Sequence, residues 1–360
     1  MRSRLLLLFL THLWMQCASA WEIARPGLAY EFPRDHLAHP AFKTEWWYFT
    51  GNLRSADGRR FGFQVTFFRQ GVNEKAGTSR FSVRDVAFAH AAITEIDGKK
   101  FHFGQEVSRM NFGEAGFGGP ERVAWIKDWD LRLPPGGGWQ FAARPGGQGI
   151  SLRAMPQKPP VIHGIDGISQ KAAGEGKSSH ASFYYSQTRL KMSGDLVLNG
   201  KKLAVTGLGW FDHEWATNQL AADQTGWNWF GLHLDDGRDL MLYQMRRTDG
   251  SIDPASSGTL VGPGGETRHL TQKDFSLTPL QRTWTSPATK ARYPLDWKVG
   301  VPSERLTFTT RAQLPDQEMN LAPVVYWEGA TELGDASGKV GSGYMELTGY
   351  GEALKALRGQ

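Results

Sequence analysis

An aromatic hairpin pattern occurs twice in this chain, and this repeat is the sequence feature that most restricts the fold. The segment 45–71 reads as an aromatic strand, an Asp-Gly-Arg turn and a second aromatic strand. The segment 226–247 has the same order, with Trp227 at the position that Trp46 holds in the first copy. The offset is 181 residues at these tryptophans and 179 residues at the two turns, so the alignment needs one two-residue gap. Matched strand, turn and return strand predict that a whole module was duplicated.

The rest of the chain also carries the pattern of β-strands. Period-two alternation of side chains covers 61–68, 83–94, 180–190 and 305–314, and 139–153 reads as one further strand. The 43 glycines and frequent turn signals separate short strands from one another. Short strands at this spacing are typical of barrels and sandwiches. The sequence therefore predicts an all-β chain built from two tandem β-barrel or sandwich modules.

The first 20 residues have the pattern of an export signal. Two arginines precede an apolar run over 5–13, and small residues over 18–20 form a cleavage site. The apolar run is too short for an ordinary membrane-spanning helix. An acylated Cys17 is the alternative, but the bulky and polar residues directly before it fit a lipoprotein site poorly. We therefore expect a signal peptide over 1–20 and a periplasmic or secreted protein.

Composition excludes several classes of function. The only cysteine lies in this leader, so the exported chain has no thiol for a disulfide, a thiolate metal site or a nucleophile. The net charge of +5 falls to +3 when Arg2 and Arg4 are removed, and no lysine or arginine run exists. Nucleic-acid binding is therefore disfavoured, while contact with a membrane surface stays open.

Hydrolase and metalloenzyme signatures are missing from the sequence. No Gly-x-Ser-x-Gly elbow occurs. His213-Glu214 begins like a zinc-protease helix, but Thr217 stands where the second histidine would be. We expect no metal and no cofactor.

Four segments closely resemble the AttH/CrtC family of exported proteins, which includes carotenoid 1,2-hydratases: EWWYFTG (45–51), HGIDGISQK (163–171), YYSQTRL (184–190) and GLGWFDHEW (207–215). The resemblance covers nearly all of the chain after the leader. It implies two tandem lipocalin-like β-barrels, which agrees with the repeat. We place the first domain at 21–216 and the second at 217–360.

The family's characterised hydratases add water to an isolated isoprenoid double bond without a cofactor. Protonating such an alkene needs an acid in a dry cavity with aromatic faces. The resemblance places the family's His-x-Trp pair at His213 and Trp215, and its strand tyrosine at Tyr243, on a strand whose core holds no aspartate. Asp212 and Glu214 are the adjacent candidate acids. Because neighbouring strand residues face opposite sides, His213 is expected to face away from both acids.

The candidate ligand-binding residues lie on aromatic strands and on the glycine-rich segment 158–180: Glu45, Trp47, His163, Asp166, Tyr185, Trp227 and Trp229. Long loops in compact domains are commonly functional, and aromatic side chains commonly line apolar pockets. Each feature also has a structural interpretation. The aromatic residues can be core packing, Glu45 a solvated strand end, and the Asp-His-Glu segment a polar brace between the modules.

The expected function is therefore the binding of a long apolar molecule, such as an isoprenoid or a lipid. Its enzymatic version is cofactor-free hydration of the carotenoid-hydratase type. Two alternatives stay open, namely a non-catalytic lipid carrier and a partner of an envelope ABC transporter.

Overall fold

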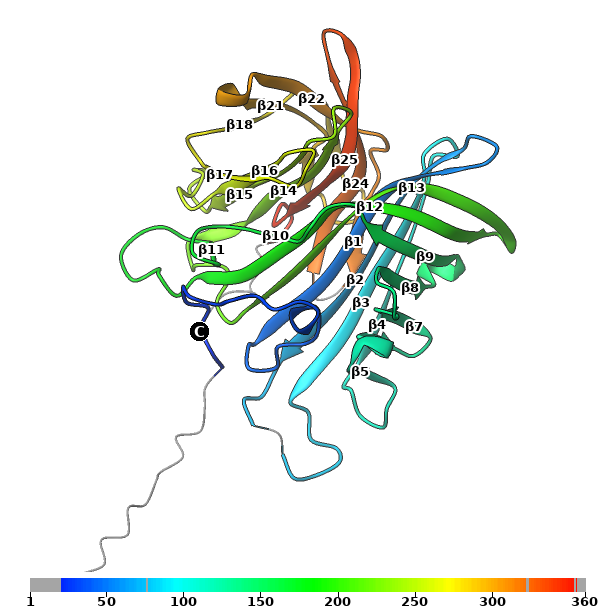
Figure 1. Ribbon diagram of the computed structural model, residues 1–360, viewed down its shortest axis with the longest axis vertical. Helices are drawn as coiled ribbons and strands as arrows, with labels where there is room; N and C mark the ends of the chain where they lie inside the picture. The colour runs from blue at the N-terminus through cyan, green and yellow to red at the C-terminus, as the bar shows by residue number, and fades with distance from the viewer. Residues whose placement is uncertain (1–20, 76, 322–323, 353, 355–360) are drawn as a thin grey trace, which may run out of the picture.

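The structure, a computed structural model, describes residues 21–75, 77–321, 324–352 and 354. The described chain folds mainly into antiparallel strands that form two large sheets, one above the other in Figure 1. The leader expected over 1–20 lies outside the described residues. No helix among the described residues is both long enough and apolar enough to cross a membrane.

The first sheet has the strand order β4-β3-β2-β1-β13-β12-β9-β8-β7-β6-β5, with β10 and β11 paired to β12. Its strands are β1 (Thr44–Ser55), β2 (Arg60–Gly71), β3 (Asp85–Glu95), β4 (Lys100–Ser108), β5 (Ala115–Phe117), β6 (Ala124–Ile126), β7 (Trp129–Arg132), β8 (Trp139–Ala143), β9 (Gly149–Pro156), β10 (Val161–Ile162), β11 (Ser169–Gln170), β12 (Ala181–Leu198) and β13 (Lys201–Ala216). The sheet curls until β4 contacts β6, where Lys127 and Glu106 form an ion pair. It is therefore a nearly closed barrel.

The second sheet has the order β17-β16-β15-β14-β25-β24-β22-β21-β18, with β23 paired to β24, and β19 and β20 form a separate hairpin. Its strands are β14 (Gln224–Leu234), β15 (Asp239–Arg247), β16 (Ser257–Val261), β17 (Thr267–Thr271), β18 (Ser276–Pro279), β19 (Thr283–Thr285), β20 (Arg292–Pro294), β21 (Asp296–Val301), β22 (Leu306–Ala312), β23 (Glu318–Leu321), β24 (Val324–Asp335) and β25 (Gly338–Thr348). Short 3-10 turns lie at η1 (Arg34–His36), η2 (Pro120–Arg122), η3 (Pro145–Gly147) and η4 (Pro302–Glu304).

The two sheets share one plan of strand pairing. The hairpin β1–β2 opens the first sheet, and β1 pairs with the last strand, β13, which pairs with β12. The hairpin β14–β15 opens the second sheet, and β14 pairs with the last strand, β25, which pairs with β24. This common plan confirms the internal repeat and the all-β, tandem lipocalin-like fold.

Both faces of the two repeated hairpins are buried, which explains why they are aromatic on both sides. Trp47 and Phe49 of β1 point into the first barrel, and Phe230 of β14 points into the core of the second sheet. Trp46 of β1 and Trp227 of β14 instead belong to a third apolar cluster that lies between the two sheets. Trp46 and Trp227 therefore occupy equivalent places, as the repeat predicts.

The strands predicted over 61–68, 83–94, 180–190 and 305–314 fall in β2, β3, β12 and β22. The prediction of one strand over 139–153 was wrong. The turn η3 divides it into β8 and β9, because Pro145 cannot donate to the ladder and the two glycines after it have positive φ angles, 55° and 77°.

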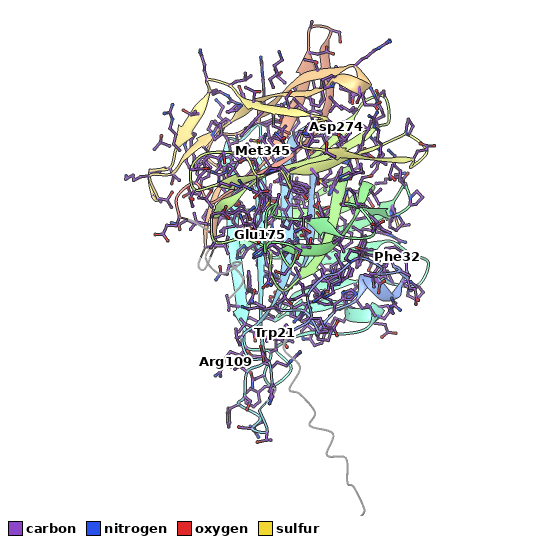
Figure 2. All side chains as sticks on the ribbon, turned by 90° about the vertical axis from the view of Figure 1, so that its left-hand side faces the viewer. Trp21, Phe32, Arg109, Glu175, Asp274 and Met345 are labelled. Carbon is purple, nitrogen blue, oxygen red and sulfur yellow. The ribbon has the colours of Figure 1, made fainter. Side chains whose placement is uncertain are left out.

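The segment 158–180 joins the two sheets. Its short strands β10 and β11 pair with β12, and the Nζ of Lys158 lies 2.7 Å from the Oδ2 of Asp239 in the second sheet. Arg189 of β12 also reaches Asp239, at 2.7 Å. Figure 2 shows Glu175 of this segment at the height where the two sheets meet. The segment thus covers one side of the space between them.

Candidate functional site

An apolar cavity lies between the two sheets, and we call it the interface cavity. It contains about 1000 Å³ of space free of protein atoms, solvent at its mouth included. Its lining comes from both sheets and from the segment 158–180: Thr44, Trp46, Tyr48, Thr66, Phe68, Arg69, Gln70, Phe88, Lys171, Tyr184, Asp212, Glu214, Gln219, Trp227, Trp229, Tyr243, Met245, Val324, Tyr326, Glu346, Thr348 and Leu354. A mostly apolar pocket with a few convergent polar groups is typical of a small-molecule site.

Asp212 of β13 is one of three acidic residues in this lining. Its carboxyl group accepts hydrogen bonds from the Tyr184 hydroxyl at 2.8 Å, from the Trp210 indole at 2.6 Å and from the Ser186 hydroxyl. Burial raises the pKa of Asp212 to about 7, although these three bonds favour the charged form. Asp212 can therefore gain or lose a proton near neutral pH.

Glu346 of β25 is the second acid, and it has a poorer set of partners. The Trp227 indole donates to its Oε1 at 3.1 Å. Burial raises the pKa of Glu346 to about 8, and the negative charges of Asp212 and Glu214 add to the rise. Its cross-strand neighbour is Glu328 of β24. Within the described residues, neither carboxyl oxygen of Glu328 accepts a hydrogen bond of normal length and angle. A carboxyl group in this position is a neutral acid at pH 7.

Glu214 of β13 differs from the other two acids because it has a cation. Lys171 lies 2.8 Å from its Oε1, and the Lys171 ammonium also lies over the rings of Tyr184 and Tyr243, 4.9 Å and 4.6 Å from their centroids. Burial alone would lower the pKa of Lys171, but the charge of Glu214 raises it overall. This pair holds charge in the cavity wall without an unpaired ion.

The hydroxyl of Tyr243 turns away from the acids. It lies 2.9 Å from the hydroxyls of Ser169 and Ser257, so it ties β15 to β11 and β16. The ring of Tyr243 lines the cavity and lies under the Lys171 ammonium.

His213 and Trp215 face the inside of the first barrel, as the alternation along β13 predicts. The Nε2 of His213 lies 3.0 Å from Glu45, and its Nδ1 lies 3.2 Å from the Tyr185 hydroxyl. Trp47 stacks on His213 with ring centroids 4.6 Å apart. We call Glu45, Trp47, Tyr185, His213 and Trp215, with His39 and Arg69, the barrel cluster. These five predicted residues lie together, but away from Asp212 and Glu214.

Glu45 is the centre of the barrel cluster. Arg69 donates to its Oε2 at 3.0 Å, and the Nδ1 of His39 lies 2.8 Å from its Oε1. Burial alone would raise the pKa of Glu45, but the hydrogen bonds from His213 and His39 lower it. The ligand-type atoms of His39, Glu45 and His213 lie within 4.8 Å of one another. Since Arg69 and the two imidazoles already bond this carboxylate, the group is an ion-pair network as it stands.

Three of the predicted ligand residues lie away from the interface cavity. Glu45, Trp47 and Tyr185 line the barrel interior and not the interface cavity. The reason is that Trp46 and Tyr184, their chain neighbours, take the cavity-facing positions of β1 and β12. Glu45 is also fully buried, so it is no solvated strand end.

The remaining predicted ligand residues divide as follows. Trp227 and Trp229 line the cavity, and the Trp229 indole donates to the Tyr184 hydroxyl at 3.0 Å. His163 is buried behind the wall, where its ring nitrogens lie 2.8 Å from Thr259 and 2.6 Å from Ser186. Asp166 is exposed on the turn between β10 and β11 and lines no part of the cavity.

Sequence reasoning missed Glu346, Glu328 and Lys171. A signal for Glu346 exists, because GYME over 343–346 repeats GWFD over 209–212. In the structure Asp212 pairs with Tyr48 of β1, and Glu346 pairs with Trp229 of β14. The two acids therefore hold equivalent places in the two copies.

The pKa of Glu346 predicts how stability depends on pH. Its folded-state pKa is raised from 4.5 to about 8, so its stabilising contribution is complete below pH 4.5 and is lost as pH rises through about 8. We expect Glu346 to contribute a fall of about 1 kcal/mol per pH unit in the free energy of unfolding in this window, and Glu346→Gln to make the slope shallower by that amount. Urea unfolding at several pH values measures it. Glu332→Gln, an exposed site on β24, is the control; equal slopes in both variants would contradict the prediction.

Fold and site together define a tandem lipocalin-like protein with an acid-lined apolar cavity between its two sheets. The sequence matches the AttH-like family over residues 23–350. The chain therefore belongs to the AttH-like family.

Individual relatives agree with this assignment. The crystal structure of an AttH protein from Nitrosomonas europaea is 33% identical in sequence, with a TM-score of 0.83, and the match covers 92% of this chain and 100% of that one. Kievitone hydratase from Nectria haematococca shares the fold, with a TM-score of 0.68, 17% identity, and coverage of 92% of this chain and 94% of that one.

A dehydratase, asqC, of Emericella nidulans is 25% identical over 166 residues. The match covers 44% of this chain and 44% of that protein, so the chain spans less than half of the length of this curated relative.

Proposed function

We propose that this protein binds a long apolar molecule, such as an isoprenoid or an acyl chain, in the interface cavity. We further propose that it adds water across a carbon–carbon double bond of this molecule, or forms such a bond by removing water from an alcohol, without a cofactor. One observation supports this proposal most strongly. Two carboxyl groups with raised pKa values, those of Asp212 and Glu346, lie in the wall of a mostly apolar cavity. An acid that stays protonated near neutral pH in a dry site is what an unactivated alkene requires.

The aromatic lining supports the same chemistry. Protonation of an alkene leaves a carbocation, and the faces of Trp and Tyr rings stabilise positive charge. Trp46, Trp227 and Trp229 bring indole rings to the cavity, and Tyr184 adds a phenol ring. Two relatives are named as a hydratase and a dehydratase, which are the two directions of one reaction. Export to the periplasm or beyond the cell, with contact to a membrane surface or an envelope transporter, remains part of the proposal.

A non-catalytic lipid carrier is the second candidate. It is favoured by the hydrogen bonds to Asp212, because the hydroxyls of Tyr184 and Ser186 satisfy a structural carboxyl group as well as a catalytic one. The carrier needs the apolar lining but no proton transfer.

An acyclic carotenoid in detergent micelles separates the two candidates. We expect the protein to convert part of it to a product heavier by one water, measured by mass spectrometry. The double variant Asp212→Asn/Glu346→Gln should bind the carotenoid and convert it at least about 100-fold more slowly, since both acids of the cavity wall that have raised pKa values are gone.

Asp195→Asn/Glu332→Gln is the matched control, with the same two chemical changes at partly exposed positions of β12 and β24. It should convert the carotenoid like the unmodified protein. Binding without conversion in every form of the protein would establish the carrier.

A further inference from the structure

We propose that the two acids of the interface cavity have different, fixed roles: Glu346 donates the proton to the substrate, and Asp212 accepts the proton from the attacking water. This assignment rests on the proposed function for its chemistry. It is carried by the internal repeat and by the difference between the two environments that the repeat has produced.

The repeat makes the comparison strict, because equivalent positions can be matched one by one. Asp212 pairs across the sheet with Ser186 of β12, and Glu346 pairs with Glu328 of β24. Two positions further along, Glu214 pairs with Tyr184, and Thr348 pairs with Tyr326. The duplicated site thus keeps an acid and a tyrosine in each copy, while the neighbours of each acid have diverged.

The environment of Asp212 stabilises a carboxylate. The hydroxyls of Tyr184 and Ser186 and the indole of Trp210 all donate to it. The Lys171 ammonium lies over the Tyr184 ring, so a cation is close to the same wall. Three donors and a nearby cation favour the charged form of a buried acid, which is the form that takes up a proton from water.

The environment of Glu346 stabilises a neutral acid. One indole, that of Trp227, donates to it. Its cross-strand neighbour is Glu328, which stands where the first copy has Ser186, so a second carboxyl group replaces a hydroxyl donor. The pKa of Glu328 is raised by burial and by the charge of Glu346, so Glu328 is neutral beside it. Burial and the negative charges of Asp212 and Glu214 raise the pKa of Glu346 to about 8, so Glu346 holds its proton near neutral pH until a substrate takes it.

Other titratable groups around Glu346 are few and mostly neutral. The charged or titratable residues that face it from the elements packed around the cavity are Glu328 and Tyr326 on β24, Tyr344 on β25, Tyr48 on β1, Asp212 and Glu214 on β13, Tyr184 on β12 and Lys171 after β11. Burial raises the pKa of Tyr48, Tyr184, Tyr326 and Tyr344 well above its usual value. Lys171 is the cation of this set, and it is paired with Glu214; Arg69, which also lines the cavity, is paired with Glu45 and Asp85.

The two acids belong to facing sheets. Asp212 lies on β13 of the first sheet and Glu346 on β25 of the second, while β1 contacts β25 through the Asn52 side chain and the Gly343 carbonyl, 3.0 Å apart. An unsaturated chain bound in the cavity would meet Asp212 on the first sheet and Glu346 on the second. Acids on two different strands can act separately, one on the alkene carbon and the other on the attacking water.

The step balances in atoms and charge. The O–H bond of Glu346 breaks, and its proton and the alkene π pair form a C–H bond, which leaves a carbocation and the Glu346 carboxylate. Water then forms a C–O bond to the cation and gives one proton to the Asp212 carboxylate. The product is an alcohol, and one proton returns from Asp212 to Glu346 through solvent. Dehydration is the same sequence reversed.

Indole resonances test the assignment without any substrate. The Trp227 indole N–H reports on Glu346, and the Trp210 indole N–H reports on Asp212. With indole-¹⁵N tryptophan in the full chain, and Trp→Phe variants for assignment, we expect the Trp227 resonance to titrate about one pH unit above that of Trp210. Glu346→Gln should abolish the Trp227 transition and keep that of Trp210. Equal midpoints, a reversed order or no titration would overturn the assignment.

The rate profile with the acyclic carotenoid supplies the second test. The pH dependence of kcat/KM should be bell-shaped, with a rising limb that Asp212→Asn removes and a falling limb that Glu346→Gln removes, each variant at least about 100-fold slower. Loss of the limbs in the opposite order would overturn the assignment while leaving the proposed hydration intact. If the unmodified protein does not hydrate the carotenoid, the proposed function is contradicted. The indole titration would still decide which acid holds its proton.

Discussion

Replacing Glu45 by alanine is expected to lower the free energy of unfolding by about 3 kcal/mol, because the change removes the buried carboxylate that joins Arg69, His39 and His213, while Arg69 keeps Asp85 as a partner. Arg69 is 2% exposed, and its Nε donates to Glu45 at 3.0 Å. His39 and His213 donate to the other oxygen. Removing one member of a buried charge network is costly because the desolvated partners stay behind. Urea unfolding followed by tryptophan fluorescence measures the loss.

The matched control for this prediction is Glu31→Ala. Glu31 pairs with Arg34 at 2.7 Å, but both side chains are more than half exposed, so water replaces the lost contact. We expect no measurable change in that variant. If the Glu45 and Glu31 variants have the same free energy of unfolding, the barrel cluster does not stabilise the first barrel. A direct chemical role for His213 would then be the better explanation of the cluster.

Replacing Asp239 by alanine should lower the free energy of unfolding by a similar amount, but the affected contacts lie at the junction of the two sheets. Asp239 is fully buried in the second sheet, and it holds Lys158 and Arg189 of the first. Its loss leaves two cations without a carboxylate at the junction of the domains, for which about 3–5 kcal/mol is expected. Hydrogen exchange should show faster exchange in β12 and β15, which face each other there, than in β2 or β21.

Asp236→Ala is the control for the junction. Asp236 lies three residues earlier on an exposed turn and pairs with Arg238 of the same turn. It should leave both stability and exchange at the junction unchanged. Uniformly faster exchange throughout both sheets in the Asp239 variant would instead mean that this residue supports the second barrel as a whole.

The fold was largely predictable because its signals are local. Alternation over 61–68 and an Asp-Gly turn before it specify a hairpin through neighbouring residues alone. The same signals repeated near Trp227 specify a second hairpin, and the structure shows that both open a sheet of the same plan. The exception was the strand expected over 139–153, where Pro145 and the two glycines after it interrupt the ladder.

The site was less predictable, and Trp46 and Trp47 show why. Alternation says that these two side chains face opposite sides of β1, but both sides are buried in this fold. Hydrophobicity therefore cannot tell which of them faces the barrel and which faces the cavity. The predicted residue, Trp47, faces the barrel and its neighbour Trp46 lines the cavity, and Tyr185 and Tyr184 divide in the same way.

Glu346 was missed for a different reason. Its equivalence to Asp212 depends on which strands pair, and those strands lie far apart in the chain. The similarity of GYME to GWFD is only four residues long, so it has little weight until the register is known. Lys171 depends in the same way on a loop conformation, which no periodic pattern encodes.

The account depends most on the interface cavity being the place where an apolar guest binds, and filling it with protein is the most direct test. Thr66 lies in the cavity wall and is 1% exposed, whereas Thr267 is exposed on β17. Titration with cis-parinaric acid, a fluorescent polyene fatty acid, should give an unchanged Kd for Thr267→Trp. It should give a Kd at least about tenfold higher for Thr66→Trp, a loss of about 1.4 kcal/mol. Equal, unweakened binding by both folded variants would contradict the account, because the guest would then bind elsewhere.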